Sequence, residues 1–313
     1  MPVRSIHRAR RKPLKGRVAL VAGATRGAGR GIACMLGEAG ATVYCSGRST
    51  RQHPATGVYA GRPETIEETA DLVTAGGGAG IPVRTDHLDE SQVAALCARI
   101  DKEQGRLDVL VNDISEGERY DWQPFWRLNP EQGLRALRSG VHSHIITARH
   151  AVPIMVAHRR GLIVEIGDGD RFYYRGHLFY DLVKTSTSRL AWAMAQELHD
   201  HRVAAVAVTP GFMRTEMLLD ELGVTEENWR SVAVKTPNLE HSETPFYVGR
   251  AVAALAGDRK VLDKSGGLYT SAGLAREYGF TDVDGARPNV WPHVRAAVPA
   301  AKTAVEWRLG RTS

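Results

Sequence analysis

Seven apolar runs of strand length recur along the chain, and all but the last are followed by a segment with helical periodicity. The strand-like runs occupy residues 17–23, 41–47, 81–86, 107–113, 161–167, 202–211 and 266–273. The helical segments cover residues 29–40, 63–76, 90–105, 130–158, 178–200 and 244–256. Apolar strands that alternate with helices predict βα units and a parallel sheet.

The strand-like runs are apolar at nearly every position, which indicates that both faces of the sheet are buried. We therefore expect an α/β protein, with a doubly wound (Rossmann) seven-stranded parallel sheet and helices on both faces. Seven strands in one sheet leave no second core, so residues 17–275 are predicted to form a single domain. Residues 1–16 are predicted to be a basic flexible tail, and residues 276–313 a C-terminal extension.

A polar excursion at residues 217–243 and a Pro/Gly-containing loop at residues 51–62 interrupt the repeat. Ligands of open α/β sheets bind beyond the carboxyl ends of the strands. The excursion is therefore predicted to close over a substrate, and plain surface decoration is the alternative interpretation.

A glycine-rich turn follows the first strand-like run. Its glycines, Gly23, Gly27 and Gly29, have the spacing Gly-x3-Gly-x-Gly, and Thr25, Arg26 and Ala28 are the cofactor-binding candidates between them. Glycines permit a tight turn and let backbone N–H groups approach a pyrophosphate at the N-terminus of the next helix. The spacing differs from the usual Gly-x-Gly-x-x-Gly fingerprint, but its place after the first strand predicts a dinucleotide site.

The end of the second strand indicates which dinucleotide binds. NAD sites place an acidic residue about 20 residues after the glycines, whereas this chain has Gly47, Arg48 and Ser49 there. Arg48 and Arg26 suit a 2′-phosphate, which a guanidinium binds through paired hydrogen bonds. We predict NADP (NADPH) rather than NAD, and simple solvation of both arginines is the alternative.

Tyr180 and Lys184 lie four residues apart in the predicted helix over 178–200, so they share one helical face. A free phenol has a pKa near ~10, and a nearby ammonium and an oxidised nicotinamide ring lower it. We expect Tyr180 to act as general acid/base, assisted by Lys184. The reaction would be hydride transfer between a nicotinamide and a carbonyl or alcohol substrate.

These motifs resemble those of the short-chain dehydrogenase/reductase family over roughly residues 16–275. The resemblance rests on the glycine turn, Asp86, Asn112 in "VLVND", Tyr180 with Lys184, and "PGFMRT". The segments "LVNDIS", "GRPETIEETA" and "VTEENWR" most resemble a branch of the family related to dehydrogenase/reductase member 1. The resemblance implies a homodimer or homotetramer that pairs through the helices over 130–158 and 178–200.

The resemblance also implies which residues bind the cofactor. Beyond the glycine turn, Arg48 and Ser49, these are Asp86, His87, Asn112, Tyr180, Lys184, Pro210, Gly211, Met213 and Thr215. Asp86 and the backbone of His87 would hold the adenine, and Asn112 would fix the fourth strand against the cofactor. The segment 210–215 would flank the nicotinamide, and Lys184 would bind the nicotinamide ribose.

Two active-site residues of the family are replaced. The serine falls at Gly167 or Asp168, and the helper asparagine aligns near Gly140. Asp168 would have to be protonated to replace the serine hydroxyl, and an ionised Asp168 would raise the pKa of Tyr180. We favour an outward-facing Asp168, and a catalytic Asp168 is the alternative. Other candidate donors are the hydroxyls of Tyr173, Tyr174 and Ser115 and the backbone of residues 167–169.

Charge is concentrated at the N-terminus. The formal net charge is +6, and residues 1–17 carry seven positive charges and no acid. The rest of the chain is therefore near −1, which argues against a nucleic-acid-binding face. A solvated tail is the interpretation that we favour, and phosphate, anionic lipid or an organelle address are alternatives. No apolar run is long enough for a membrane span.

Three cysteines, Cys34, Cys45 and Cys97, lie in apolar segments and predict buried thiols of a reducing, cytoplasmic protein. No metal site is expected, because His142 and His144 are two residues apart and face away from each other on a helix. They are predicted to lie on the helix surface or at a subunit interface.

The leading function is an NADP-dependent oxidoreductase with a small-molecule substrate. The alternatives are a catalytically impaired nucleotide-binding regulator, a non-redox enzyme, and a nucleic-acid-associated protein that uses the tail.

Overall fold

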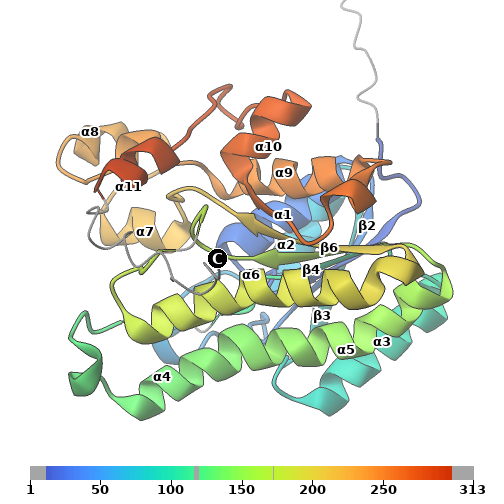
Figure 1. Ribbon diagram of the computed structural model, residues 1–313. Coiled ribbons are helices and arrows are strands. Elements are labelled where there is room, and N and C mark those ends of the chain that lie inside the picture. The colour runs from blue at the N-terminus through green and yellow to red at the C-terminus, as the bar shows by residue number, and fades with distance from the viewer. Residues whose placement is uncertain (1–11, 116–119, 172, 298–313) are drawn as a thin grey trace, which may run out of the picture.

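The computed structural model describes residues 12–115, 120–171 and 173–297. Seven parallel strands form one sheet in the order β3-β2-β1-β4-β5-β6-β7 (Figure 1). The strands are β1 Val18–Ala22, β2 Thr42–Gly47, β3 Ala79–Arg84, β4 Val109–Asn112, β5 Gly161–Ile166, β6 Val203–Thr209 and β7 Leu268–Thr270. The predicted doubly wound fold is confirmed, and the strand order reverses at β1, where such sheets open a ligand crevice.

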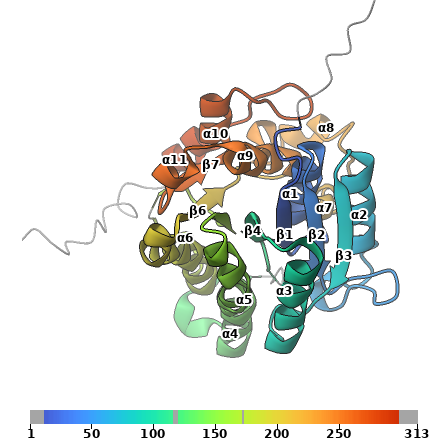
Figure 2. The ribbon, with the colours of Figure 1, turned by 90° about the vertical axis from the view of Figure 1, so that its right-hand side faces the viewer.

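Helices cover both faces of the sheet (Figure 2). One face carries α1 Gly27–Glu38, α2 Ile66–Ala75, α9 Pro245–Gly257 and α10 Ser271–Tyr278. The other carries α3 Glu90–Gln104, α5 Ser143–Ala157 and α6 Leu178–Leu198. Further helices are α4 Pro130–Leu137, α7 Glu216–Glu221, α8 Arg230–Ala233 and α11 Trp291–Ala297.

Alternate residues of each central strand enter opposite halves of the core. In β1, Ala19 and Val21 pack toward α1 and α9, whereas Val18 and Leu20 pack toward α3 and α5. All five residues of β1 are buried, as expected for a central strand of a parallel sheet. The thiols of Cys34, Cys45 and Cys97 are also buried and free, as predicted.

Several predicted boundaries are wrong in detail. The helix predicted over 130–158 is interrupted by a π-helical turn at Arg138–His142, between α4 and α5. The last strand is followed by a helix, α10, which the sequence pattern did not reveal. Residues 12–16, assigned to the tail, belong to the fold, because Leu14 is 1% exposed in the core and its N–H bonds the carbonyl of Ala39.

The remaining predictions about the tail, at residues 1–11, and about the extension beyond residue 297 lie outside the described residues. Within the described ranges, no helix is both long and apolar enough to cross a membrane. The same ranges contain no group of three His, Cys, Asp or Glu side chains that could hold a metal ion.

Candidate active site

The glycine-rich turn brings the end of β1 against the end of β4. Gly23 has a φ of +91°, and a Cβ there would collide with the carbonyl oxygen of Asp113. Gly27 has a φ of +55° at the start of α1. A Cβ on Gly29 would in turn collide with the carbonyl oxygen of Gly23. Side chains are therefore excluded where the backbone must be free to approach a ligand.

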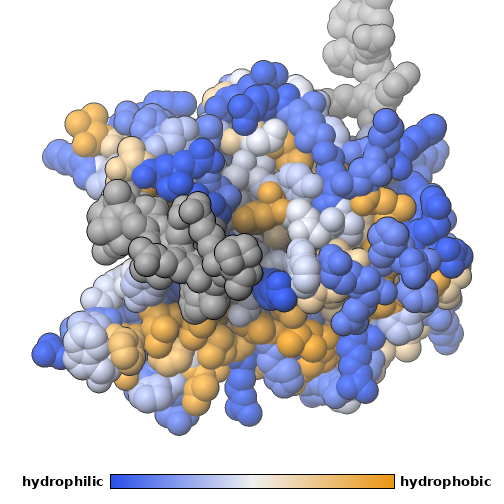
Figure 3. Space-filling view, viewed as in Figure 1, coloured by the Kyte–Doolittle hydropathy of each residue, from blue (hydrophilic) through white to orange (hydrophobic). Residues whose placement is uncertain are grey.

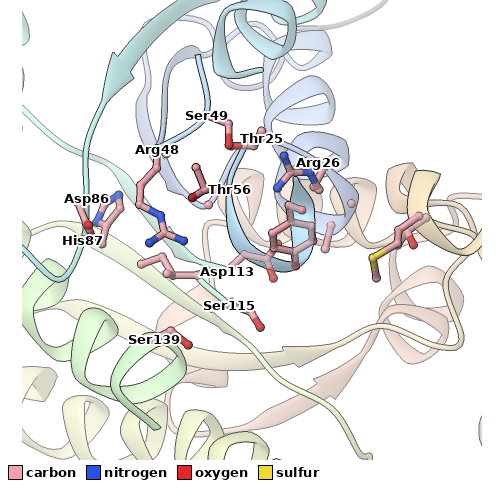
Figure 4. Close-up of a pocket in the computed structure, with 18 of the residues that line it drawn as sticks. Thr25, Arg26, Arg48, Ser49, Thr56, Asp86, His87, Asp113, Ser115 and Ser139 are labelled. Carbon is pink, nitrogen blue, oxygen red and sulfur yellow. The ribbon is translucent and has the colours of Figure 1, made fainter. Parts of the chain in front are cut away.

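A cavity of about 230 Å³ opens over this turn. It is bounded by the ends of β1, β2 and β4, by the loop after β2, and by the start of α7. Figure 4 shows Thr25 and Ser49 on one side and Asp86 and His87 on another, with the side chain of Arg48 extending into the cavity from the end of β2.

Most of the predicted cofactor-binding residues meet at this cavity. Those that line it are Gly23, Thr25, Arg26, Gly27, Ala28, Arg48, Ser49, Asp86, His87, Met213 and Thr215. Six others do not line it: Gly29, Asn112, Tyr180, Lys184, Pro210 and Gly211. Gly29 acts through close packing. Asn112 is fully buried and donates to Glu165 Oε1 at 2.7 Å, so it stabilises the strand pair beneath the cavity.

Arg26 is held by acidic and aromatic neighbours. Its Nε lies 3.4 Å from Glu64 Oε2, and its guanidinium stacks on the Tyr59 ring at 4.3 Å. Glu64 also pairs with Arg62, which in turn pairs with Asp220 in α7. The loop after β2 is thereby tied to α7. One nitrogen of Arg26, Nη2, is buried without a hydrogen-bond partner, which leaves a donor for a ligand in the cavity.

The N-terminus of α1 already binds an anionic group. The N–H of Gly27 donates to Glu216 Oε2 at 2.9 Å, and Arg30 Nη1 lies 3.6 Å from Glu216 Oε1. Glu216 is the first residue of α7 and lines the cavity. A free helix N-terminus attracts negative charge, so the carboxylate occupies a position that suits a phosphate. The glycine turn at the cavity, the unpaired donor of Arg26 and this anion position together fit a dinucleotide.

We expect Glu216→Gln to tighten NADP⁺ binding by roughly 5- to 10-fold, because it removes a negative charge that competes for the helix N-terminus. Calorimetric titration of the full chain measures the effect. The matched control is Glu221→Gln, an exposed residue at the other end of α7 that does not line the cavity. Equal affinity of the Glu216 variant and the wild type would mean that the diphosphate does not bind at α1.

The segment 210–215 is held from behind by a buried carboxyl group. Glu243 is 1% exposed, and its Oε2 accepts from Gly211 N at 2.9 Å and from Ser271 Oγ at 2.5 Å. Its backbone N–H and C=O pair with Phe212 and Arg214. Burial raises the pKa of Glu243 to about 8, although the bonds from Ser271 and Gly211 oppose the rise. Sequence reasoning missed this support, because Glu243 lies at the end of the polar excursion and no pattern marks it as buried.

Tyr180 is positioned by the start of α6. His177 is the N-cap of this helix, and its Nδ1 accepts from Tyr180 N at 3.3 Å. The rings of Tyr120 and Trp122 pack around Tyr180, with centroids at 5.1 and 6.2 Å. Its hydroxyl donates to Asp168 Oδ2 at 2.6 Å.

The prediction that Asp168 faces outward is therefore wrong. Asp168 follows β5, and the turn that begins there directs its carboxylate to the phenol oxygen. Burial, followed by the charge and the hydrogen bond of Asp168, raises the pKa of Tyr180 well above its ordinary value. This is the opposite of the predicted lowering. Burial and Asp168 set this direction, and Lys184 Nζ lies 5.9 Å from the ring centroid of Tyr180.

Lys184 connects the phenol to the cavity. It interacts electrostatically with Asp113, which lines the cavity at the end of β4. Burial raises the pKa of the Asp113 carboxyl to about 6, and Lys184 and the N–H of Gly29 oppose that rise. Tyr180 and Lys184 therefore adjoin the cavity from the α6 side rather than line it.

The other candidate donors differ in their positions. Tyr174 is 45% exposed. Tyr173 lies near Asp168, and burial together with that charge raises its pKa to about 12. Ser115 lines the cavity. The guanidinium of Arg175 donates to the backbone oxygen of Asp168 at 3.0 Å and to Asp181 Oδ1 at 2.9 Å, and so fixes the 168–181 turn.

The helix that would carry the family's helper asparagine has no room for a side chain at Gly140. A Cβ there would lie 2.6 Å from Val183 Cγ1 in α6. One turn further along, His144 is 2% exposed. Its placement on the helix surface or at an interface is therefore a wrong prediction, whereas His142 is exposed. His144 is buried because its partner is Glu165 in β5, a fully buried acid within an apolar strand.

Comparison with known proteins agrees with this geometry. A family model of short chain dehydrogenases matches residues 17–222. Dehydrogenase/reductase SDR family member 1 of Mus musculus is 34% identical over 279 residues, which cover 87% of this chain and 85% of that protein. Versicolorin reductase 1 of Aspergillus parasiticus is 27% identical over 276 residues, with coverages of 82% and 97%.

Solved structures of short chain dehydrogenases are similar to this fold. A short chain dehydrogenase from Mycobacterium thermoresistibile, 21% identical, superimposes with a TM-score of 0.73 over 89% of this chain and 95% of that one. The chain belongs to the short-chain dehydrogenase/reductase family and is an oxidoreductase that acts on CH–OH or C=O groups.

Proposed function

We propose that the protein is an NADP-dependent oxidoreductase in which Tyr180 exchanges a proton with the substrate oxygen. The observation that carries this proposal is the position of Lys184, whose Nζ lies 5.9 Å from the ring centroid of Tyr180 and which interacts electrostatically with Asp113 at the cavity wall. A cofactor bound at the glycine turn would meet the substrate between that turn and the side chains of Tyr180 and Lys184. The substrate itself is a small molecule with a carbonyl or alcohol group.

Separate residues bind the cofactor and transfer the proton. NADPH, when bound, supplies the hydride. Gly27 N and the donors of Arg26 and Arg48 would bind the phosphates, and the segment 210–215 would hold the end that reacts. Tyr180 donates its proton to the substrate oxygen in reduction and accepts one in oxidation. Its high pKa keeps the phenol protonated at neutral pH, so the proton is present for reduction, although the same rise makes the phenol a weaker acid.

The experiment that tests this function follows absorbance at the NADPH band with a panel of aldehydes, ketones and quinones. Turnover with at least one carbonyl compound supports the proposal. Tight NADPH binding without oxidation across the panel would support the alternative, a nucleotide-binding regulator. The hydrogen bond from Tyr180 to Asp168 gives that alternative a physical basis, because it occupies the proton that the reaction requires.

We infer NADP rather than NAD because arginine side chains, and no acid, stand at the end of β2. Arg48 lines the cavity with an exposed side chain. An acidic residue at this position would repel a 2′-phosphate and accept hydrogen bonds from an unmodified ribose. Ser49 and Thr25 add hydroxyl donors beside Arg48.

We expect Arg48→Asp to lower the ratio of NADPH to NADH specificity by about 10²-fold, since a charge-assisted hydrogen bond contributes about 1.5–3 kcal/mol and repulsion adds to its loss. Ratios of kcat/KM for the two cofactors measure the change. The control Arg51→Asp makes the same charge change in the same loop. Arg51 pairs with Asp71 and does not line the cavity, so the ratio should stay within about threefold. An unchanged ratio in the Arg48 variant would reject the assignment.

We also infer a homodimer or homotetramer. The support is a set of exposed apolar side chains on α4, α5 and α6, the region through which subunits pair in this family. These side chains are Leu134, Ile145, Leu182 and Trp192. Apolar residues gather on the lower part of the face seen in Figure 3, over α4 and α6. This part of the surface is suited to burial against a second copy of the chain.

A further inference from the structure

We propose that Asp168 selects carbonyl and alcohol substrates that carry a protonated amine on the carbon next to the reacting one, namely amino ketones and amino alcohols. The inference rests on the proposed function of Tyr180, and it names the substrate class of the same site. Its basis is a carboxylate at the phenol oxygen, where a hydroxyl group is expected from the family resemblance.

The Asp168 carboxylate shares its ion-pair partner, Arg175, with a second acid, Asp181. Arg175 is closest, but its Nη1 pairs with Asp181 at 2.9 Å and its Nε stands 3.9 Å from Asp168 Oδ2. Lys184 acts on Asp113. The side chain of Asp168 is 31% exposed, so a ligand can reach it.

The carboxylate opposes the reduction of a neutral carbonyl compound. Negative charge develops on the carbonyl oxygen during hydride addition, and a fixed negative charge next to that oxygen raises the barrier. The phenol proton is also bound to Asp168. A carbonyl oxygen can only accept hydrogen bonds, so it must take this proton and leave Asp168 unpaired.

An ammonium group on the substrate removes both obstacles. It donates to Asp168 in place of the phenol and neutralises the carboxylate. The hydroxyl of Tyr180 is then free to donate to the carbonyl oxygen, and the field that holds its proton is cancelled. The two protein atoms, Tyr180 Oη and Asp168 Oδ2, are 2.6 Å apart. Groups on adjacent carbons, such as an oxygen and an amine, match so short a separation.

The neighbouring aromatic side chains support the same ligand. The ring centroids of Tyr120 and Trp122 lie 5.1 and 6.2 Å from that of Tyr180, and Trp122 is 64% exposed. Aromatic faces attract alkylammonium groups, most strongly those of Trp. The site thus combines an anion with aromatic rings, which is the usual environment for binding a cationic amine.

The reaction is balanced without a further reactant. The carbonyl carbon gains the hydride from bound NADPH, which leaves as NADP⁺. The carbonyl oxygen takes the π electron pair and the proton of Tyr180, and Tyr180 regains a proton from water. The ammonium group keeps its protons throughout and serves only in binding and in neutralising Asp168.

The test compares two ketones of nearly equal shape, dimethylaminoacetone, which is cationic, and 4-methylpentan-2-one, which is neutral. We expect wild-type kcat/KM with NADPH to favour the amino ketone by roughly 10- to 100-fold, the effect of one charge-assisted hydrogen bond. In Asp168→Ser and Asp168→Asn the preference should fall to within about threefold. Asp168→Ser should also raise kcat/KM for the neutral ketone, by up to about 10²-fold, because it restores a hydroxyl donor.

A binding measurement separates this inference from the proposed function. Calorimetry on the NADPH-bound protein compares 1-amino-2-propanol with 2-butanol, neither of which can be oxidised by a cofactor that is already reduced. The wild type should bind the amino alcohol at least about tenfold more tightly, and Asp168→Asn should remove the difference. The control Glu131→Gln takes away an exposed carboxylate at the start of α4 and should keep the preference.

The outcomes distinguish the two claims. Equal binding and turnover of the amine and its neutral partner in the wild type, or a preference that survives Asp168→Asn, overturns the selection by Asp168. Amine-selective binding that depends on Asp168, but with no NADPH oxidation by any ketone, supports the ligand class and rejects the redox function of Tyr180.

Discussion

Tyr180→Phe is expected to lower NADPH-dependent carbonyl reduction by about 10²- to 10⁴-fold, the usual contribution of a positioned general acid. The substitution removes one oxygen and leaves the ring that packs between Tyr120 and Trp122. It also frees Asp168 from its hydrogen bond, but a carboxylate cannot replace the lost proton donor. Initial rates of NADPH oxidation measure the loss.

The affinity for NADP⁺ should stay within about threefold, since Tyr180 does not line the cavity. Tyr174→Phe is the matched control, because this tyrosine is 45% exposed in the segment that precedes α6. It should keep its rate within about threefold. A Tyr180→Phe variant with wild-type kcat/KM would remove the phenol from the mechanism.

His144→Leu is expected to lower the free energy of unfolding by about 3–5 kcal/mol, the cost of leaving a buried charge without its partner. His144 Nδ1 lies 2.6 Å from Glu165 Oε2, and its Nε2 lies 3.1 Å from the carbonyl oxygen of Ile114. Both side chains are buried, at 2% and 0% exposure. Urea denaturation of the two proteins measures the difference.

The effect should depend on pH in a defined direction. Burial disfavours the charged imidazole, but the carboxylate of Glu165 outweighs it and raises the pKa of His144. A raised pKa gives stability that is fully present below about 6.5, the ordinary value, and that is lost as the pH rises through the folded value. The variant should therefore lose more stability at pH 6 than at pH 9.

Two further variants serve as controls for the loss of stability in His144→Leu. His142→Leu changes an exposed histidine of the preceding π turn, and it should change the stability by less than about 0.5 kcal/mol. Adding Glu165→Gln to His144→Leu removes the unpaired charge and should restore part of the loss. A stability of His144→Leu equal to that of the wild type would show that the buried pair contributes nothing.

The sheet and the glycine turn were predictable because their causes are local. Apolar runs such as Val203–Thr209 are buried on both faces wherever the neighbours lie, and Gly23 is required by a turn that only glycine adopts without strain. The same logic placed Arg48 at the end of β2. In each case the residue type and its position in the repeat decide the outcome.

The contacts that tune the site depend on residues far apart in the sequence. Glu216 reaches Gly27 across 189 positions, and Glu165 meets His144 through the packing of α5 on β5. A charged residue in an apolar run, such as Glu165 in "GLIVEIG", was the available signal for a buried pair. The direction of the Asp168 side chain had no such signal, because it depends on how the turn after β5 meets α6.

A crystal structure of the NADP⁺ complex tests the central claim most directly. We expect a diphosphate at the N–H of Gly27 with the carboxylate of Glu216 displaced, a 2′-phosphate on Arg48, and the nicotinamide in contact with the side chains of Lys184 and Tyr180. A dinucleotide bound away from the glycine turn, or a phenol oxygen separated from the nicotinamide by other side chains, would contradict it.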